Sequence, residues 1–268
     1  MGSRFTGKVA LVMGAGQEIG RAVALLLAEE GASVVLNDVG LGSSMANAAT
    51  VTVDQVAKEI SLMGGTVVTS HADVSSMSGG ESVVQLALDA FGRLDVLVNN
   101  VGISDSCGIQ EMTPEEFDNI VRNNLRSTFI SSRFASIHFR KQRSGRIVNM
   151  TSDAGLGVAG RSSYAATSEG IVGLTRTVAK DLGKYGVICN AISPMSMGDS
   201  GTRTEPEDIA TMIVLLCGDT VPNVNGRVFG LSGGEIWLYE DPYVNRSVHK
   251  WGAFKMDELE CLLPSSLI

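Results

Sequence analysis

The segment Lys8–Asp38, K-V-A-L-V-M-G-A-G-Q-E-I-G-R-A-V-A-L-L-L-A-E-E-G-A-S-V-V-L-N-D, decides the fold. Its first part, residues 8–13, is a continuous apolar run, as expected of a strand in a parallel sheet that is covered on both faces. A glycine-rich turn then leads into an apolar-periodic helix over 21–30, and a second apolar run follows over 33–37. This succession predicts a β–α–β unit. A glycine-rich turn at a helix N-terminus also favours binding of a dinucleotide pyrophosphate.

The rest of the chain continues this alternation of short apolar runs and longer amphipathic segments. Further strands are predicted at residues 66–70, 94–98, 147–150, 185–192 and 226–231. Helices are predicted over about 51–63, 80–91 and 206–217, from near 162, and from Thr113-Pro114 onward, where Thr113 is the N-cap. The pattern predicts an α/β fold, a Rossmann-type doubly wound parallel sheet of about seven strands in a single domain, with helices on both faces.

We place the sheet domain at residues 1–234, where Ser232-Gly233-Gly234 closes the last strand, and a C-terminal extension at residues 235–268. The extension holds most of the large aromatic residues that lie outside the core strands. A segment of this kind packs against something more often than it stands free in solvent. The expected surface is either its own domain or a partner subunit.

Charge and composition exclude several classes of protein. The formal net charge is −8 and the basic residues are scattered, which argues against a nucleic-acid surface; R-K-Q-R at 140–143 is explained by the preference of cations for a helix C-terminus. The first strand begins too early to leave room for a signal peptide, and no apolar run reaches the roughly 20 residues that span a membrane. Four cysteines without metal-ligand spacing indicate reduced thiols and no metal site. We expect a cytoplasmic protein with no nucleic-acid or membrane partner.

Two hydroxyl side chains flank the predicted ligand crevice. The strand over 147–150 ends in Thr151-Ser152, and a glycine-rich loop then leads into the amphipathic segment that opens near Ser162. Ser152 is therefore expected at the carboxyl end of a strand, and Tyr164 in the first turns of the next helix. In an open α/β sheet this edge forms the ligand crevice, where the two hydroxyls could hold and deprotonate an alcohol.

This arrangement resembles the active-site segment of the short-chain dehydrogenase/reductase family. The resemblance implies that Ser152 orients the substrate, that Tyr164 is the acid/base, and that Asn124 holds a water of the proton relay. The family motif is Tyr-x-x-x-Lys, but position 168 is Ser168, followed by Glu169. In the family this lysine lowers the pKa of the tyrosine and binds the nicotinamide ribose, whereas an unassisted tyrosine titrates near 10. The three matching residues are therefore predicted to be vestigial.

The phosphate-binding turn also departs from the family pattern, which is Thr-Gly-x-x-x-Gly-x-Gly. The chain has Met13 for the threonine, keeps Gly14 and Gly20, and has Glu18 in place of the middle glycine. Two unit charges about 4 Å apart repel by roughly 4 kcal/mol at an effective dielectric constant of 20, so a carboxylate facing the phosphates would weaken binding several hundredfold. The alternative is that Glu18 turns to solvent and costs little.

The resemblance implies further cofactor contacts, which are vestigial if the turn no longer binds phosphate. An acidic residue about 18 positions after Gly20 would bind an NAD ribose hydroxyl beside the long connection over 39–50. An Asp-Val pair would hold the adenine, and an Asn-Asn-x-Gly segment would line the cofactor floor. The residues that match the cofactor positions are Gly14, Ile19, Gly20, Asp38, Asp73, Val74 and Asn99.

A third departure follows the strand over 185–192. Members of the family usually have a helical lid there, preceded by a threonine that touches the nicotinamide amide. Here residues 195–201 run almost directly into the next helix, at Glu205, so the lid is nearly absent. Thr202 or Thr204 would have to replace the amide contact. Water exclusion and substrate clamping commonly depend on such a lid.

The three departures together favour a catalytically degenerate subunit of an NAD-dependent dehydrogenase complex. The resemblance covers about residues 8–234 and points to the branch of the family that acts on hydroxyacyl-CoA thioesters. NAD is then expected in the complex but not on this chain, and the partner is a catalytic member of the same family in a hetero-oligomer, a tetramer. The helices from about 114 and 162 form the family's main dimer interface, although the small residues of the second could equally pack on the sheet.

Two other readings stay open from the sequence. The chain could itself be an active NAD-dependent short-chain alcohol or 3-hydroxyacyl-CoA dehydrogenase with a rearranged site, because it has Ser152, Tyr164 and Asn124. It could instead be a dinucleotide sensor that binds NAD without turning over a substrate, because it has Asp38 and the Asp-Val pair at 73–74.

Overall fold

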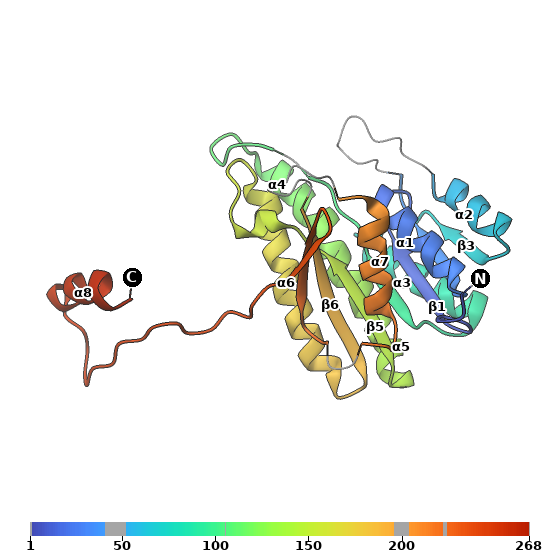
Figure 1. Cartoon of the computed structure of the whole chain (residues 1–268). Helices are drawn as coiled ribbons and strands as arrows, with labels where there is room; N and C mark the ends of the chain where they lie inside the picture. The colour runs from blue at the N-terminus through green and yellow to red at the C-terminus, as the bar shows by residue number, and fades with distance from the viewer. Residues whose placement is uncertain (1, 41–51, 105, 196–203, 222–223, 268) are drawn as a thin grey trace. The chain divides into compact units, whose positions relative to one another are not determined.

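The computed structural model describes residues 2–40, 52–104, 106–195, 204–221 and 224–267. The chain divides into two compact units, Met1–Leu238 and Tyr239–Ile268. The first unit is a single α/β layer structure built around one sheet (Figure 1). Among the described residues, no helix is long and apolar enough to cross a membrane, and no three His, Cys, Asp or Glu side chains gather as a metal ion would require.

The sheet has eight strands in the order β3-β2-β1-β4-β5-β6-β7-β8. All neighbours are parallel except β7 and β8, which pair antiparallel. The order reverses between β1 and β4, which defines the switch point of a doubly wound fold. The strands are β1 (Val9–Met13), β2 (Ser33–Asn37), β3 (Thr66–Ser70), β4 (Val96–Asn99), β5 (Gly145–Met150), β6 (Val187–Pro194), β7 (Val228–Ser232) and β8 (Glu235–Leu238).

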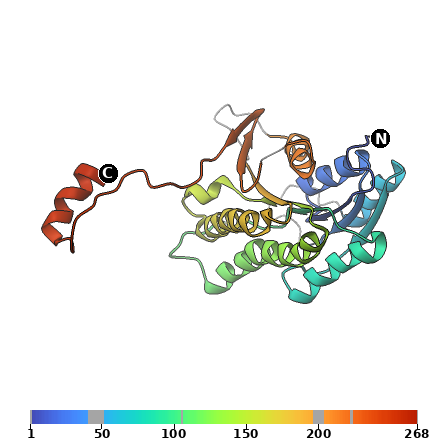
Figure 2. The same cartoon turned by 90° about the horizontal axis from the view of Figure 1, so that it is seen from below.

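Helices cover both faces of the sheet, as predicted (Figure 2). One face carries α1 (Glu18–Glu29), α2 (Val53–Leu62) and α7 (Pro206–Cys217). The other face carries α3 (Met77–Phe91), α5 (Ser127–Gln142) and α6 (Ser162–Gly183). A further helix, α4 (Pro114–Val121), continues into α5 through a π-helical turn over Arg122–Arg126, and a 3₁₀ turn over Asp153–Leu156 precedes α6.

The central strands are apolar along their whole length because both of their faces are covered. All five side chains of β1 are buried. Val12 belongs to the core beneath α1 and α7, whereas Leu11 and Met13 belong to the core beneath α3 and α5. A strand with one water-facing side would instead alternate apolar and polar residues.

The predicted start of the helix at 113 is confirmed. Thr113 is the N-cap of α4, its hydroxyl accepts from the Glu116 N–H, and the Glu116 carboxylate accepts in return from the Thr113 N–H. These hydrogen bonds hold the pKa of Glu116 below its usual range. Pro114 occupies the first helical position, where its missing N–H leaves no donor unused.

The sheet continues beyond the predicted closing turn. Gly233 and Gly234 connect β7 to β8, and β8 pairs with β7 from Glu235 opposite Ser232 to Leu238 opposite Phe229. The predicted division after Gly234 therefore falls inside a hairpin, and the compact unit ends at Leu238. Ile236 and Leu238 are exposed, so β8 lacks the buried apolar run from which the other strands were predicted.

The second unit contains a short helix, α8 (Met256–Leu262), followed by a π-helical turn over Leu263–Leu267. Lys250 forms an ion pair with Glu258, which also caps the helix by accepting from the Lys255 N–H at 2.8 Å. No described residue of this unit is buried, and Trp251 is 91 % exposed.

Candidate active site

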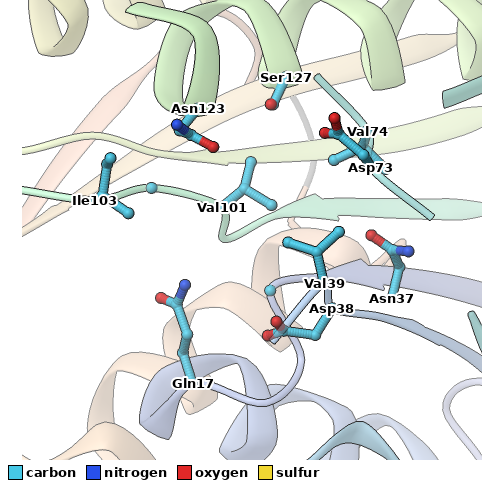
Figure 3. A pocket seen from close by; sticks show the side chains of 12 residues that line it. Gln17, Asn37, Asp38, Val39, Asp73, Val74, Val101, Ile103, Asn123 and Ser127 are labelled. Atoms are coloured by element: carbon cyan, nitrogen blue, oxygen red, sulfur yellow. The ribbon is translucent and has the colours of Figure 1, made fainter. Parts of the chain in front are cut away.

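A pocket lies at the carboxyl ends of the strands, at the switch point between β1 and β4 (Figure 3). Its walls come from the turns after β1, β2, β3 and β4 and from the helix that runs into α5. The lining residues are Gly14, Gln17, Asn37, Asp38, Val39, Asp73, Val74, Val101, Gly102, Ile103, Asn123 and Ser127. This is where ligands bind in doubly wound folds.

The glycine turn after β1 is packed so tightly that its glycines are required by the fold alone. Gly14 has φ +67°, and a Cβ there would lie 2.3 Å from the Asn100 carbonyl oxygen. A Cβ on Gly20 would lie 2.1 Å from the Gly14 carbonyl oxygen, which accepts from the Asn100 side chain at 3.1 Å. The two glycines therefore do not by themselves report that a dinucleotide binds.

Asp38 faces the glycine turn from the end of β2. One carboxylate oxygen accepts from the Gly16 N–H at 3.0 Å, and the other accepts from the Gly40 N–H at 2.8 Å. Asp38 thus lies in the pocket wall where the resemblance expects a ribose contact, but one amide of the phosphate-binding turn is already bonded to it (Figure 3).

Glu18 is the first residue of α1 and its side chain is exposed. Water screens a charge in this position, so its repulsion of a phosphate about 4 Å away would fall from roughly 4 kcal/mol towards 1 kcal/mol. The exposure of Glu18 is compatible with the alternative prediction, in which this residue costs phosphate binding little. Ile19 is half-buried against the core beneath α1, and neither residue is among the described residues that line the pocket.

The residues matched to the adenine site lie together after β3. The Asp73 carboxylate accepts from the Ser75 N–H at 2.9 Å, which closes the turn into α3. Val74 is 5 % exposed, and both Asp73 and Val74 line the pocket opposite Asp38 (Figure 3).

Asn99 is not in the pocket wall. Its side chain is fully buried and belongs to a polar network between the sheet and α5. Its amide donates to Ser132 at 3.1 Å and to Asn149 at 2.8 Å, and its oxygen accepts from Ser131 at 2.6 Å. Asn99 therefore fastens β4 to β5 and α5 from within the core.

The two predicted catalytic hydroxyls meet. Ser152 follows β5 and Tyr164 is the third residue of α6, and Ser152 lies near enough to lower the pKa of Tyr164. The Ser152 hydroxyl itself donates to the Asp153 carboxylate at 3.0 Å and accepts from the Ala154 N–H at 3.2 Å. Burial raises the pKa of Tyr164 above its ordinary value of 10, against the opposing effects of Ser152 and the positive charge of Arg161. Tyr164 is therefore protonated at neutral pH.

Ser168 lies one helical turn beyond Tyr164 and is 3 % exposed. Its hydroxyl donates to the Tyr164 carbonyl oxygen at 2.8 Å, and its own carbonyl accepts from Thr151 at 2.9 Å. Position 168 therefore offers the crevice neither a positive charge nor a free hydroxyl. Glu169 is exposed beside the turn at Gly155, where an added Cβ would lie 2.8 Å from a Glu169 carboxylate oxygen.

Asn124 lies in the π-helical turn and is 3 % exposed. Its side chain bonds both backbone groups of Ile103, accepting from the N–H and donating to the carbonyl, each at 2.9 Å. Its backbone carbonyl accepts from Thr128 at 2.8 Å. Asn124 thus holds Ile103, in the segment that follows β4, against the π-helical turn. Turns of this kind often mark functional sites.

Sequence reasoning missed several residues that shape the site. Gln17, Val39, Asn123 and Ser127 line the pocket, and Arg161 acts electrostatically on Tyr164. In the sequence, these residues are marked only by lying close to a residue that matches the family pattern. Such closeness does not indicate where a side chain points.

Two predictions concern segments that lie partly outside the described residues, namely the connection over 41–50 and the short lid segment over 196–201 with Thr202. Thr204 is described, and its hydroxyl accepts from the Gly233 N–H at 2.9 Å and donates to the Met195 carbonyl at 3.2 Å. These two hydrogen bonds connect Thr204, just before α7, with Met195 after β6 and with Gly233 in the turn after β7.

The sequence pattern described as short chain dehydrogenase matches residues 8–208. The chain therefore belongs to the short-chain dehydrogenase family. A solved structure of a short chain dehydrogenase from Mycobacterium avium superposes with a TM-score of 0.89 at 35 % identity, covering 98 % of this chain and 96 % of that one. This likeness confirms the α/β fold.

Among curated relatives, the mouse peroxisomal multifunctional enzyme type 2 is 38 % identical over 253 residues, 88 % of this chain. The Neurospora crassa peroxisomal hydratase-dehydrogenase-epimerase is 34 % identical over 243 residues, 87 % of this chain. The chain spans only 32 % and 27 % of these two enzymes. The Thauera aromatica (2S)-[(R)-hydroxy(phenyl)methyl]succinyl-CoA dehydrogenase subunit BbsD is 32 % identical over 85 % of this chain and 96 % of its own length.

Proposed function

We propose that this chain is a catalytically degenerate subunit that supports an active short-chain dehydrogenase in an NAD-dependent hydroxyacyl-CoA-type dehydrogenase complex. The observation that carries the proposal is Ser168. In the family a lysine at this position lowers the pKa of the tyrosine, whereas here a buried hydroxyl bonds the Tyr164 carbonyl.

The chemistry of alcohol oxidation explains why this matters. A base must take the hydroxyl proton, and Tyr164 is the group beside Ser152 that could take it. A tyrosine that titrates above 10 is ionised in fewer than about one molecule in a thousand at pH 7. Burial is the largest influence on the pKa of Tyr164 and raises it. Ser152 and the positive charge of Arg161 lower this pKa, but by less than burial raises it.

The residues present do not fit a whole dinucleotide. Asp38, Asp73 and Val74 suit an adenosine, but Ser168 stands where the family has the lysine that binds the nicotinamide ribose. The Gly16 N–H, which a glycine-rich turn offers to phosphate, is bonded to Asp38. We therefore assign no hydride-transfer step to this chain, and we propose that NAD is bound by the partner.

The proposed partner is a catalytic member of the same family, in a hetero-oligomer that we propose is a tetramer. Support comes from the Thauera aromatica relative, whose name identifies it as one subunit of a dehydrogenase for a hydroxyacyl-CoA thioester. More specifically, we propose that this chain is the non-catalytic subunit of a 2-[hydroxy(phenyl)methyl]succinyl-CoA dehydrogenase of anaerobic toluene breakdown. We propose a cytoplasmic complex.

Reconstitution with an active family member that has an intact Tyr-x-x-x-Lys motif tests the proposal. NADH formation is measured for each chain alone and for the mixture, with this chain as wild type and as Tyr164→Phe. The proposal expects co-purification, no turnover by this chain, and equal support from wild type and Tyr164→Phe. The matched control is the same Tyr→Phe change in the partner, which should abolish turnover. NAD-dependent turnover by this chain alone would refute the proposal.

The second candidate function is an active dehydrogenase with a rearranged site, and the observation that favours it is that Ser152 lies near enough to Tyr164 to lower its pKa. In that case Tyr164→Phe must abolish the activity of the isolated chain, and an unchanged rate would exclude this function.

Calorimetric titration with NAD tests the remaining hypothesis, that the chain is a dinucleotide sensor. Micromolar binding without turnover would favour the sensor. No binding by wild type, with binding gained in a Glu18→Gly, Ser168→Lys double variant, would favour loss of the cofactor site and a role in assembly.

A further inference from the structure

A cluster of positive charge surrounds one tyrosine of this acidic chain. Three cationic groups lie close to the centre of the Tyr185 ring, the guanidinium carbon of Arg140 at 5.3 Å, that of Arg143 at 5.8 Å and the ammonium nitrogen of Lys184 at 5.4 Å. All three cations are exposed, and Tyr185 is half-buried. We call these four residues the Tyr185 cluster. Lys184 lies 41 positions beyond Arg143, so only the folded chain brings the cations together.

The cluster lies at the amino-terminal edge of the sheet. Arg143 is the C-cap of α5 and precedes β5, whereas Lys184 is the C-cap of α6 and precedes β6. The Arg143 guanidinium donates to the Lys184 carbonyl at 3.1 Å, which joins the two helix ends at the lower edge of the view in Figure 1. The candidate active site is at the opposite, carboxyl edge, and β6, with eight residues, spans about 25 Å between the two.

The cations of the cluster have no carboxylate partner in the part of the chain that the structure describes. None of the ion pairs there involves them. Residues 119–152 contain no Asp or Glu, and Asp181, one turn before Lys184 on α6, is exposed. Lys141 adds a further exposed positive charge beside the cluster. The surroundings of the Tyr185 ring are therefore positive, although the chain has a net charge of −8.

The attraction of cations to helix C-termini explains only part of this arrangement. It favours a cation at the end of α5 and another at the end of α6. It does not account for cations of both helices at one ring, where they repel one another. Cation–π attraction to Tyr185 offsets that repulsion. The cations are therefore held in place before a ligand arrives, and an anion would find its binding site already ordered.

The size of the cluster indicates the class of anion. Because all three charged groups lie within 5.8 Å of one ring centre, no two of them are further apart than twice that distance. Nucleic acid or a lipid surface is anionic over a much larger area and would also meet the acidic remainder of the chain. A small ligand with several phosphates close together matches both the size and the sign, and guanidinium groups suit phosphate oxygens.

The position of the cluster indicates that it serves a neighbouring subunit. It lies at the opposite edge of the sheet from this chain's own crevice. The family resemblance places α6 in a subunit interface, so we expect the C-terminal end of α6 beside a neighbouring subunit. In the proposed complex the partner binds a hydroxyacyl-CoA thioester. The CoA group of such a thioester carries a diphosphate and a 3′-phosphate at the end remote from the acyl group.

We propose that the Tyr185 cluster binds the phosphates of a CoA thioester whose acyl end lies in the partner's active site. The degenerate subunit then supplies substrate affinity to a reaction that its partner carries out. The proposal rests on the proposed function for the identity of the thioester. Binding of a compact polyphosphate by the cluster is a property of this chain alone and is measured without the partner.

Calorimetric titration of the full chain with coenzyme A tests the site. We expect binding that weakens as salt rises from about 50 to 200 mM, and weaker binding of NAD and of dephospho-coenzyme A, which both lack the 3′-phosphate. Arg140→Gln/Lys184→Gln should weaken coenzyme A binding about tenfold, because two exposed ion pairs are lost. The matched control is Lys58→Gln/Arg126→Gln, which removes two exposed charges outside the cluster and should change binding by less than about twofold.

The reconstituted complex provides a second readout. Arg140→Gln/Lys184→Gln, shown by circular dichroism to be folded, should raise KM for the acyl-CoA substrate about tenfold and leave kcat unchanged, because it removes binding without altering the reacting groups.

Four results would each overturn the proposal. They are absence of coenzyme A binding, binding that Arg140→Gln/Lys184→Gln does not weaken more than the control does, inorganic phosphate binding as tightly as coenzyme A, and an unchanged KM in an active complex. NAD turnover by the isolated chain would overturn the proposed function alone, so the two failures are distinguishable.

Discussion

The central prediction is that a lysine at position 168 would lower the pKa of Tyr164. The two positions are four residues apart on α6, so their Cβ atoms lie about 5–6 Å apart. For an ammonium and a phenolate held at a similar separation, the attraction at an effective dielectric constant of 20 is about 3 kcal/mol, or about two pKa units. Ser168 is 3 % exposed, so desolvation of the new cation offsets part of this gain and we expect a net decrease of about one unit.

The assay is tyrosinate absorbance at 295 nm, titrated from pH 7 to 11. The chain has four tyrosines, so the signal of Tyr164 is taken as the difference between each protein and its Tyr164→Phe counterpart. Ala166→Lys is the matched control, because it adds the same single charge to α6 at an exposed position. It should move the pKa of Tyr164 by less than half as much as Ser168→Lys does.

Two results would refute this reasoning. A wild-type pKa of Tyr164 well below 10 would mean that another group already stabilises the phenolate. An unchanged pKa in a Ser168→Lys protein that circular dichroism shows to be folded would mean that position 168 does not communicate with the phenol.

Three further predictions concern stability and are checked by urea unfolding. Gly20→Ala should destabilise the fold by about 2 kcal/mol, because its Cβ would lie 2.1 Å from a carbonyl oxygen, whereas Gly173→Ala, with nothing within 4 Å, should stabilise it by about 0.5–1 kcal/mol; the opposite order would contradict the packing described. Asn99→Ala should cost about 3 kcal/mol by leaving buried partners unpaired, and a loss below about 1 kcal/mol would argue against the network. Burial raises the pKa of Cys189 to about 12, so stability should be complete below pH 9 and fall as pH rises towards 12, less steeply in Cys189→Ala; equal slopes would exclude this thiol as a cause.

Much of the fold could be predicted because its signals are local. Continuous apolar runs, caps and glycine turns specify strands and helices within a few residues of each other, and parallel connection rules then order the sheet. The same locality brings Ser152 and Tyr164 to one crevice, since a strand end and the following helix start share an edge. The antiparallel strand β8 was not predicted, because Ile236 and Leu238 are exposed and β8 does not form a buried apolar run like those of the other strands.

The chemistry of the site depends on side-chain direction, which the sequence does not contain. Only the tertiary structure shows that Glu18 is exposed, that the Ser168 hydroxyl bonds the Tyr164 carbonyl, and that Asn99 belongs to a buried network away from the pocket. The sequence by itself determined the family, the sheet and the absent lysine. The tertiary structure decided which charges are screened and which hydroxyls are already bonded, because burial and hydrogen bonding arise between residues far apart in the chain.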